Sequence, residues 1–308
     1  MKWHKQGTIF QSNNDFSWMI SHAQVPTVLV MDDCFRVYFS TRNSLGKSQI
    51  ALIDLDLDNP SKILRLHHSP ILVPGKPGTF DEDGVMPGCV LQKENEIWLY
   101  YTGWNQKIST PYHNAIGIAV SKDAGYTFDR LFEGPILDRS PYEPYITATP
   151  KVIMDNNQYK MWYGSGTEWI KIEDKYESVY DIKFATSVDG ISWDRSGQTC
   201  ITSDCKLEAL CTPSVVVEQD CYKMWYSYRD AVNFRDGQGS YRIGYAESRD
   251  GVAWTRMDKQ AGIDLSATGW DSKMQCYPCV VKHDAQYYMF YNGNDFGRSG
   301  FGYAVRKI

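Results

Sequence analysis

The segments Pro150-Lys-Val-Ile-Met154 and Tyr159-Lys-Met-Trp-Tyr-Gly164 decide the fold, because the same pair returns along the whole chain. The pair consists of a proline with a β-branched run, a polar turn, and a strand rich in aromatic residues. Its other copies begin at Pro26, Pro87, Pro213 and Pro278, and successive prolines are 61, 63, 63 and 65 residues apart. Self-similarity at a nearly fixed period predicts a repeat architecture built from one supersecondary unit.

Each unit continues with a third strand that ends in a tight turn. The turns contain Asp123-Ala-Gly125, Asp189-Gly190 and Asp250-Gly251. Asp-Gly between alternating strands is a strong hairpin signal. An aromatic residue follows each turn and opens a fourth strand. These stretches resemble the sialidase Asp-box, S-x-D-x-G-x-x-W, whose aspartate shapes a turn, so we expect the three aspartates to be architectural.

Five units of four antiparallel strands predict an all-β, five-bladed β-propeller that forms a single domain over residues 1–308. The blades are expected near residues 20–75, 80–138, 143–202, 206–262, and 270–308 together with 1–10. The last unit ends after its third strand, whereas the stretch from Trp3 resembles the fourth strand that follows Trp193. We therefore expect the N-terminal strand to complete the last blade, which also removes exposed sheet edges.

Composition narrows the class of protein. The 308 residues are 43% hydrophobic and 22% charged, with a net charge of −5, so the chain can bury a large core but lacks the basic face of a nucleic-acid binder. No apolar run is long enough to span a membrane, and no signal peptide is recognisable at the start. A cytoplasmic location is therefore expected, and the eight cysteines are most simply free thiols.

The propeller topology predicts where a site forms. The first strand of a blade lines the axis and the second runs back, so residues before each proline and after each second strand meet on one face. Loops and ligand groups converge there. The substrate-binding candidates on this face are His22, Arg42, Asp81, Trp104, Asn105, Arg229, Asp271, Asn292 and Asn294.

Carboxylates reach the same face from several units. Cleavage of a glycosidic bond needs one carboxylic acid to protonate the leaving oxygen and one carboxylate as base or nucleophile. Glu208 lies among apolar neighbours and is the candidate general acid, because an apolar setting raises a carboxyl pKa. Asp83 is the candidate base or substrate anchor, and Glu143 is able to replace either. In the alternative interpretation, each of these acids is a solvent-exposed loop residue or caps a turn.

At this point the chain resembles the five-bladed propeller glycosidases, which include the arabinanase/xylosidase, invertase/levansucrase and β-mannoside phosphorylase families. The resemblance is carried by Tyr159–Tyr163, Tyr222–Tyr226, the Ser-x-Asp-Gly turns, and Phe80-Asp-Glu-Asp-Gly-Val-Met-Pro87. It implies the fold and carbohydrate chemistry. Some relatives hold a channel ion such as calcium. The sequence departs from the arabinanase and invertase patterns in the first unit, where Ser21–Pro26 contains no carboxylate.

Two arginines add a second clue about the substrate. Arg42 and Arg229 end equivalent second strands, and arginine binds carboxylate or phosphate through two parallel hydrogen bonds. We expect a substrate with an anionic group, such as a uronic or ulosonic acid, a sugar phosphate or a nucleotide sugar, or else phosphate as the attacking nucleophile. The alternative is that each arginine pairs with a neighbouring carboxylate such as Asp230.

The function these features favour is a glycoside-processing enzyme, hydrolytic or phosphorolytic, that acts at the mouth of the propeller channel. Its expected partners are carbohydrate or sugar-phosphate small molecules, without nucleic acid or a membrane span. No resident cofactor or metal is indicated: the CxxC spacing of Cys276 and Cys279 lacks the second ligand pair of a zinc site. Two alternatives remain open, namely a glycosyltransferase-like enzyme of surface-polysaccharide synthesis and a non-catalytic carbohydrate-binding propeller.

Overall fold

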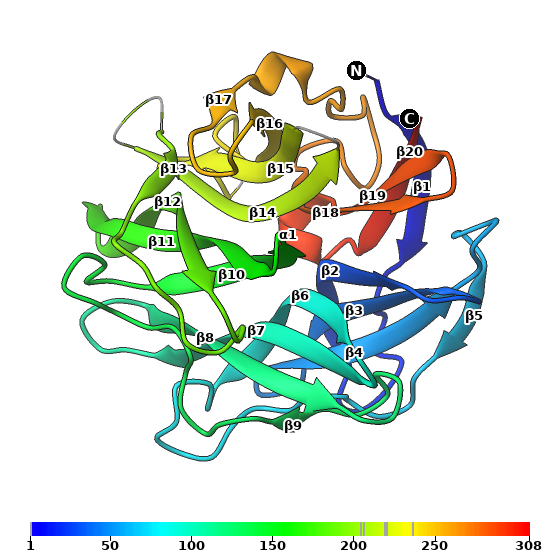
Figure 1. Cartoon of the computed structure of the whole chain (residues 1–308), viewed down its shortest axis with the longest axis horizontal. Coiled ribbons are helices and arrows are strands. Elements are labelled where there is room, and N and C mark those ends of the chain that lie inside the picture. Colours follow the sequence, from blue (N-terminus) through cyan, green and yellow to red (C-terminus); the bar gives the residue numbers. More distant parts are fainter. Residues whose placement is uncertain (1, 204, 206, 219–220, 236) are drawn as a thin grey trace.

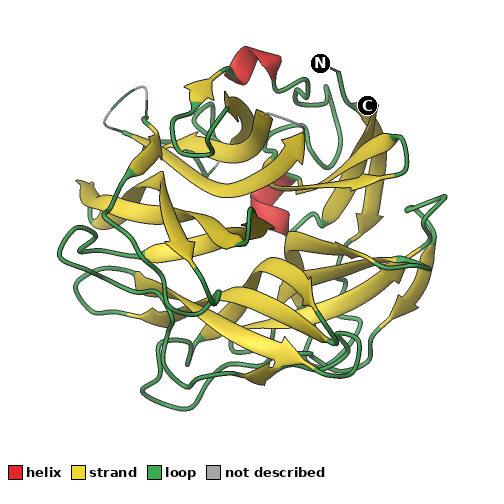
Figure 2. Ribbon diagram, in the orientation of Figure 1, coloured by secondary structure: helices red, strands yellow, loops and turns green. Residues whose placement is uncertain are grey.

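The chain folds into β-strands joined by loops, as the computed structural model of residues 2–203, 205, 207–218, 221–235 and 237–308 shows (Figure 2). Apart from strands, these residues form two short helical turns, η1 (Asp258–Gln260) and α1 (Asn294–Gly297). The predicted all-β class is therefore confirmed.

The strands follow the repeat units. The first unit contains β2 (Ser21–Val30), β3 (Phe35–Arg42), β4 (Ser48–Leu55) and β5 (Ile63–Leu66). The second contains β6 (Gly84–Lys93), β7 (Glu96–Gln106), β8 (Tyr112–Ser121) and β9 (Asp129–Arg130). The third contains β10 (Thr147–Asp155), β11 (Gln158–Ile172), β12 (Lys175–Ser187) and β13 (Thr199–Ile201). The fourth contains β14 (Glu208–Glu218), β15 (Cys221–Asp230), β16 (Arg242–Ser248) and β17 (Thr255–Arg256). The fifth contains β18 (Cys276–His283), β19 (Gln286–Asn292), β20 (Phe301–Lys307) and, from the other end of the sequence, β1 (His4–Phe10).

The units form β-propeller-like sheets around a common centre. Strands within a unit pair antiparallel, and the first two units share one sheet through a single parallel pair, Ser48 with Gly84. The first strands β2, β6, β10, β14 and β18 contact one another in cyclic order, with β18 next to β2. Figure 1 shows them around the middle of the molecule, with α1 among them.

The N- and C-terminal segments meet in one sheet. β1 pairs antiparallel with β20, with His4 opposite Val305 and Phe10 opposite Phe301, and both termini lie at the same edge (Figure 1). The indole nitrogen of Trp3 donates to the carbonyl of Ala261, and its ring packs edge-on against Trp225, 5.6 Å away between centroids. The predicted pairing of the N-terminal strand with the last unit is confirmed.

The Asp-box turns connect neighbouring units. The carboxylate of Asp189 accepts hydrogen bonds from the backbone N–H groups of Ile191 and Ser192, and Asp123 and Asp250 accept from the corresponding amides. The carbonyl of Gly190 then accepts from the hydroxyl of Tyr100 in the preceding unit. The architectural role predicted for these aspartates is confirmed.

Each first strand has a register shift where it passes the centre. The shifts lie at Gln24/Thr27, Pro87/Cys89, Ala148/Lys151, Cys211/Ser214 and Cys276/Cys279. In four units the residue before the proline has left-handed φ, namely 54° at Val25, 49° at Thr149, 51° at Thr212 and 55° at Tyr277. Such values are strained for residues with a Cβ and cluster at functional sites. The strained residues therefore indicate that a functional site lies at the centre of the molecule.

No helix among the described residues has the length and apolar character needed to cross a membrane.

Candidate functional site

A central cavity of about 380 Å³ is lined by residues of all five units. The first strands contribute residues before each proline, including Val25, Met86 and Tyr277, and the second strands contribute residues near their ends, including Trp104 and Arg229. The prediction that these two sets of positions meet is confirmed. The volume lies in the range of small-molecule sites, about 300–1,000 Å³.

Four of the predicted substrate-binding residues line this cavity: His22, Arg42, Trp104 and Arg229. They come from the first, second and fourth units. Arg42 lies over the ring of Trp104, with 5.5 Å from its guanidinium carbon to the ring centroid, and donates to the carbonyl of Gly46. Burial, followed by Arg42 and Arg298, lowers the pKa of His22 to about 4, so its ring is neutral at pH 7.

Arg229 is buried, at 3% exposure, among neutral groups. Its Nε donates to the hydroxyls of Tyr180 and Tyr241, and its two terminal nitrogens donate to the carbonyls of Asp230 and Ser178. The expected alternative, an ion pair with the Asp230 carboxylate, is not what the structure contains. Within the described residues, neither Arg42 nor Arg229 has a carboxylate partner.

Most of the predicted acids lie elsewhere, in a contact that repeats from unit to unit. Asp81 accepts hydrogen bonds from Tyr101 and Arg130, and Glu143 accepts from Tyr163 and Arg195. We call this acid–tyrosine–base contact the clip. Both acids are fully buried.

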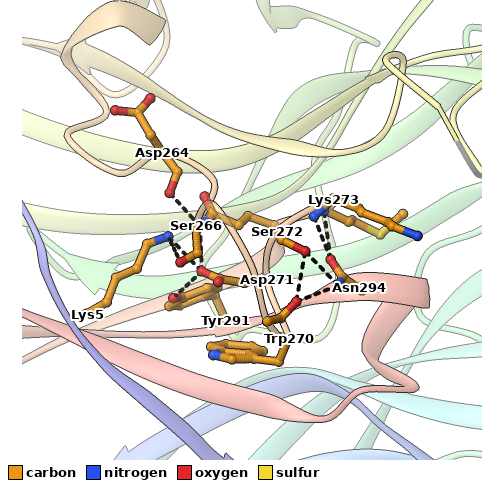
Figure 3. A network of polar contacts seen from close by, with 12 residues as sticks. Lys5, Asp264, Ser266, Trp270, Asp271, Ser272, Lys273, Tyr291 and Asn294 are labelled. Atoms are coloured by element: carbon orange, nitrogen blue, oxygen red, sulfur yellow. Dashed lines mark hydrogen bonds and ion pairs between the residues drawn. The ribbon is translucent and has the colours of Figure 1, made fainter.

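The third clip joins the N-terminal strand to the last unit (Figure 3). Asp271 accepts from Tyr291 and Gln275 and forms an ion pair with Lys5 of β1, with an N–O distance of 2.7 Å. Lys5 also donates to Ser266. Asp271 therefore holds β1 against the fifth unit and does not line the cavity.

Glu208 takes the clip position of the fourth unit in a modified form. Its two carboxylate oxygens accept from the two terminal nitrogens of Arg256, at 2.6 and 2.7 Å. The tyrosine of this unit, Tyr226, donates instead to Asp258. In the first unit, Phe39 and Met19 occupy the tyrosine and acid positions and pack in one apolar cluster.

Asp83, Glu143 and Glu208, which were predicted to converge on one opening, do not line the central cavity. The acids of the clips precede their prolines by five to seven residues, whereas the residues before the prolines that line the cavity lie one, two or four positions from them. Asp83 accepts a hydrogen bond from the backbone N–H of Gln106, and this contact and Lys47 hold its pKa below the usual range. It lies beside Trp104, whose carbonyl accepts from its backbone N–H.

The three predicted amides also lie outside the cavity lining. Asn292 is fully buried: its Oδ1 accepts from the backbone N–H of Val25, and its Nδ2 donates to two carbonyls. Asn294 accepts from the amides of Lys273 and Met274 (Figure 3). Asn105 has a buried Oδ1 without a hydrogen-bond partner among the described residues.

Several lining residues were missed from the sequence. The aromatic wall consists of Tyr112, Tyr180, Phe234, Tyr241 and Phe296, and Glu177 and Arg235 lie on the same cavity. Most of them come from the connections between second and third strands, including the long β11–β12 hairpin. The unusual length of these connections was the available signal, because long loops carry binding residues.

The described residues contain no cluster of three or more His, Cys, Asp or Glu side chains that could hold a metal ion. The eight cysteines are free thiols, including Cys276 and Cys279.

The chain is similar over its whole length to two Mycobacterium tuberculosis proteins, the uncharacterized proteins MT1551 and Rv1502. Each is 39% identical over 307 residues, which is 99% of this chain and 99% of the relative. The protein belongs to the family of these two mycobacterial proteins. The glycosyl hydrolases family 32 N-terminal domain matches residues 64–208 of this member of the family. A β-1,2-mannobiose phosphorylase of a Thermoanaerobacter species is 27% identical over 120 residues, covering 35% of this chain and 39% of its own.

Solved structures share the fold of this chain. One glycoside hydrolase structure superposes with a TM-score of 0.75 at 17% identity, over 99% of this chain and 93% of its own. A thermostable family-43 glycoside hydrolase gives a TM-score of 0.67 at 16% identity, over 94% and 90%. The chain therefore has a glycoside hydrolase-like β-propeller fold.

Proposed function

We propose that the chain is a glycoside-processing enzyme, of hydrolase or phosphorylase type, in which the central cavity binds an anionic group of the substrate or phosphate itself. One observation carries the proposal. The cavity contains Arg42 and Arg229, neither of which has a carboxylate partner among the described residues.

The burial of Arg229 makes this observation informative. Moving a charge out of water costs several kcal/mol unless an opposite charge accompanies it. Here the guanidinium meets only hydroxyls, carbonyls and aromatic rings of the described residues, with the ring of Phe234 3.8 Å away between guanidinium carbon and centroid. An anionic ligand supplies the missing countercharge and binds through charge-assisted hydrogen bonds.

The chemistry of the lining favours phosphorolysis over hydrolysis by two carboxylates. Among the described lining residues, Glu177 is the one carboxylate, and it is already paired with Arg235. Hydrolysis needs a second carboxylate to activate water or attack the sugar. Phosphate brings its own negative oxygen, and a relative is named as a mannobiose phosphorylase. Trp104 and the tyrosines supply ring faces for the sugar.

Asp83 stays a candidate substrate anchor or base at the edge of the site, next to Trp104. For Glu143 and Glu208 we favour a structural role, since their oxygens are occupied by Arg195 and Arg256 within their own units.

The same proposal includes a single five-bladed domain. It counts β2–β5 and β6–β9 as separate blades, because one parallel pair alone joins them among the described residues. A cytoplasmic location belongs to the proposal as well, supported by eight free thiols.

The proposal is tested by turnover on a panel of activated glycosides and sugar phosphates, with and without inorganic phosphate. The panel contains neutral, uronic and ulosonic sugars, and nucleotide sugars. We expect turnover that requires phosphate or an anionic sugar. It should fall about 10–100-fold in Arg42→Gln and Arg229→Gln, as for loss of a hydrogen bond to a charged group.

Arg65→Gln is the matched control, because Arg65 is exposed and lies outside the cavity lining. Phosphate-independent turnover of neutral glycosides that Arg42→Gln leaves unchanged would refute the anionic-substrate proposal. Sugar binding without turnover of any compound would favour the non-catalytic carbohydrate-binding alternative, and transfer from a nucleotide sugar would favour the transferase.

A further inference from the structure

The ion pair between Glu177 and Arg235 lies on the wall of the cavity. Both carboxylate oxygens of Glu177 accept from Nη2 of Arg235, at 2.7 and 2.9 Å. The side chain of Glu177 is 14% exposed, whereas that of Arg235 is 58% exposed. The carboxylate is therefore held in the wall while its partner reaches into solvent.

Arg235 and Arg229 share one aromatic ring. Their guanidinium carbons lie 4.4 and 3.8 Å from the centroid of Phe234. An anion bound by Arg229 therefore lies within reach of Arg235 as well, after a change in the rotamer of a long and exposed side chain.

The backbone next to Glu177 is fixed from two sides. The hydroxyl of Ser178 shares a hydrogen bond of 2.8 Å with the hydroxyl of Tyr112, and its carbonyl accepts from Nη2 of Arg229 at 3.0 Å. The backbone next to Glu177 is consequently held against Arg229 whether or not Arg235 remains in contact with the Glu177 carboxylate.

We infer that Glu177 and Arg235 form an exchange pair: an anion that enters the cavity takes Arg235 away from Glu177, and the released carboxyl carries the proton for the leaving group. The inference rests on the proposed function, because it requires an anion in the cavity. An ion pair with one partner in solvent contributes little to stability. A bound anion that contacts two arginines outcompetes such a pair, and a carboxyl that loses its cation and gains an anionic neighbour favours its protonated form.

The resulting step balances when phosphate is the nucleophile. Glu177 donates its proton to the glycosidic oxygen as the bond between C1 and that oxygen breaks, and the electron pair of the bond stays on the oxygen. An oxygen of hydrogen phosphate forms the new bond to C1. The proton of that phosphate then restores the Glu177 carboxyl. After the sugar phosphate has left, Glu177 releases this proton to solvent and Arg235 returns to the carboxylate.

Other titratable groups near the pair are few among the described residues. Tyr112 and Arg229 contact the neighbouring residue Ser178 from β8 and β15, and neither changes charge near pH 5.5. His22 lines the same cavity and has a pKa of about 4, so a bound anion also favours its protonation. An experiment on proton uptake must separate His22 from Glu177.

Sulfate is the probe, because it does not titrate in the relevant range. Its binding is measured by calorimetry at about pH 5.5 in two buffers with different ionisation enthalpies, which gives the protons taken up per anion. We expect uptake of about one proton in the wild type. The uptake should be lost in Glu177→Gln and kept in His22→Asn and in the control Glu133→Gln, which removes an exposed carboxylate outside the cavity lining.

Sulfate binding without proton uptake, or uptake that His22→Asn abolishes and Glu177→Gln does not, overturns the exchange while leaving the anion site intact. Failure of sulfate to bind overturns the proposed function together with the exchange. So does a sulfate affinity that Arg229→Gln leaves unchanged. A crystal structure of the wild type soaked in sulfate gives an answer independent of variant folding. The exchange predicts the Arg235 guanidinium on the sulfate, and an unbroken Glu177–Arg235 pair beside bound sulfate contradicts it.

Discussion

The backbone N–H of Val25 donates a hydrogen bond to Oδ1 of Asn292, 2.7 Å away, and so joins the first central strand to the last unit. Equivalent bonds run from Thr149 to Thr102 and from Tyr277 to Ser227. In each case the donor is the residue before a repeat proline, and the acceptor side chain belongs to the second strand of the preceding unit. These bonds hold the strained residues that line the cavity. The same hydrogen bonds therefore stabilise both the cyclic arrangement of the first strands and the walls of the site.

Replacement of Asn292 tests this basis directly. Asn292→Leu leaves the N–H of Val25 and the carbonyls of Ala23 and Gly300 without the partners they have in the wild type. Each unsatisfied buried group costs about 1–3 kcal/mol, and we expect the free energy of unfolding to fall by about 3 kcal/mol in urea titrations. Gln92→Ala, at a hairpin residue far from the centre, should change it by less than about 0.5 kcal/mol. An equally stable Asn292→Leu protein with weakened sugar binding would restore the substrate-binding role predicted from the sequence.

The clips give a second prediction, for Glu143. In Glu143→Gln the guanidinium of Arg195, whose side chain is 14% exposed, loses the charge of its fully buried partner. Breaking a buried ion pair costs about 3–5 kcal/mol, and we expect a loss of stability in that range with unchanged kcat for the folded protein. Thermal unfolding and turnover are measured on the same preparation. A kcat reduced 100-fold at unchanged stability would make Glu143 the catalytic acid after all.

Closure between the N- and C-terminal segments gives a third prediction. Trp3 is 4% exposed, contacts Trp225, and donates to the carbonyl of Ala261. Loss of a buried tryptophan side chain costs about 3–5 kcal/mol, so Trp3→Ala should lower the midpoint of thermal unfolding by several degrees. Calorimetry measures the effect, and His4→Ala at an exposed neighbouring position is the control. Equal midpoints for the two variants would show that β1 contributes little to the closed fold.

His22 predicts a pH dependence of stability. Its pKa is lowered from 6.5 to about 4 in the folded protein, mainly by burial. The unfolded chain therefore binds the proton more readily, and the contribution of His22 to stability is present above pH 6.5 and is lost as the pH falls toward 4. After allowance for solvent screening of a partly exposed ring, we expect a loss of about 1–2 kcal/mol.

The measurement is the free energy of unfolding at pH 7 and pH 4 for the wild type and His22→Asn. Asparagine suits the substitution because it tolerates the left-handed φ of 66° at this position. The variant should lose less stability than the wild type over this interval. An identical loss in both proteins would assign the acid sensitivity to other groups.

Most of the fold could be predicted from the sequence, because strand periodicity, turn residues and the interval between prolines are local signals. The return of β1 to β20 was also predictable, since the last unit lacks a fourth strand and the sequence begins with a matching one. What the sequence did not reveal is the merging of the first two units into one sheet, which depends on the single pair of Ser48 with Gly84.

The central cavity lies where the sequence predicted that strand ends and loops meet, but only some of the predicted residues line it. Arg42, Trp104, Arg229 and His22 were found because they adjoin the strand ends. The sequence did not predict that the clip acids pair within the protein. Near a strand end, a carboxylate that faces a cavity has the same local sequence pattern as one that pairs with an arginine of its own unit. A regular feature could have revealed them: Asp81, Glu143 and Asp271 each precede their tyrosine partner by 20 residues. Glu177 and Arg235 were missed because long connections have no periodicity to place them.

The central claim, that the cavity receives an anion between its arginines, is tested most directly by a crystal structure determined after soaking in inorganic phosphate or citrate. The account predicts the anion in the cavity, within hydrogen-bond distance of the guanidinium groups of Arg229 and Arg42, and its disappearance from the same soak of Arg229→Gln. A cavity that stays free of the anion at saturating phosphate and citrate, with both arginines unmoved, would contradict the account.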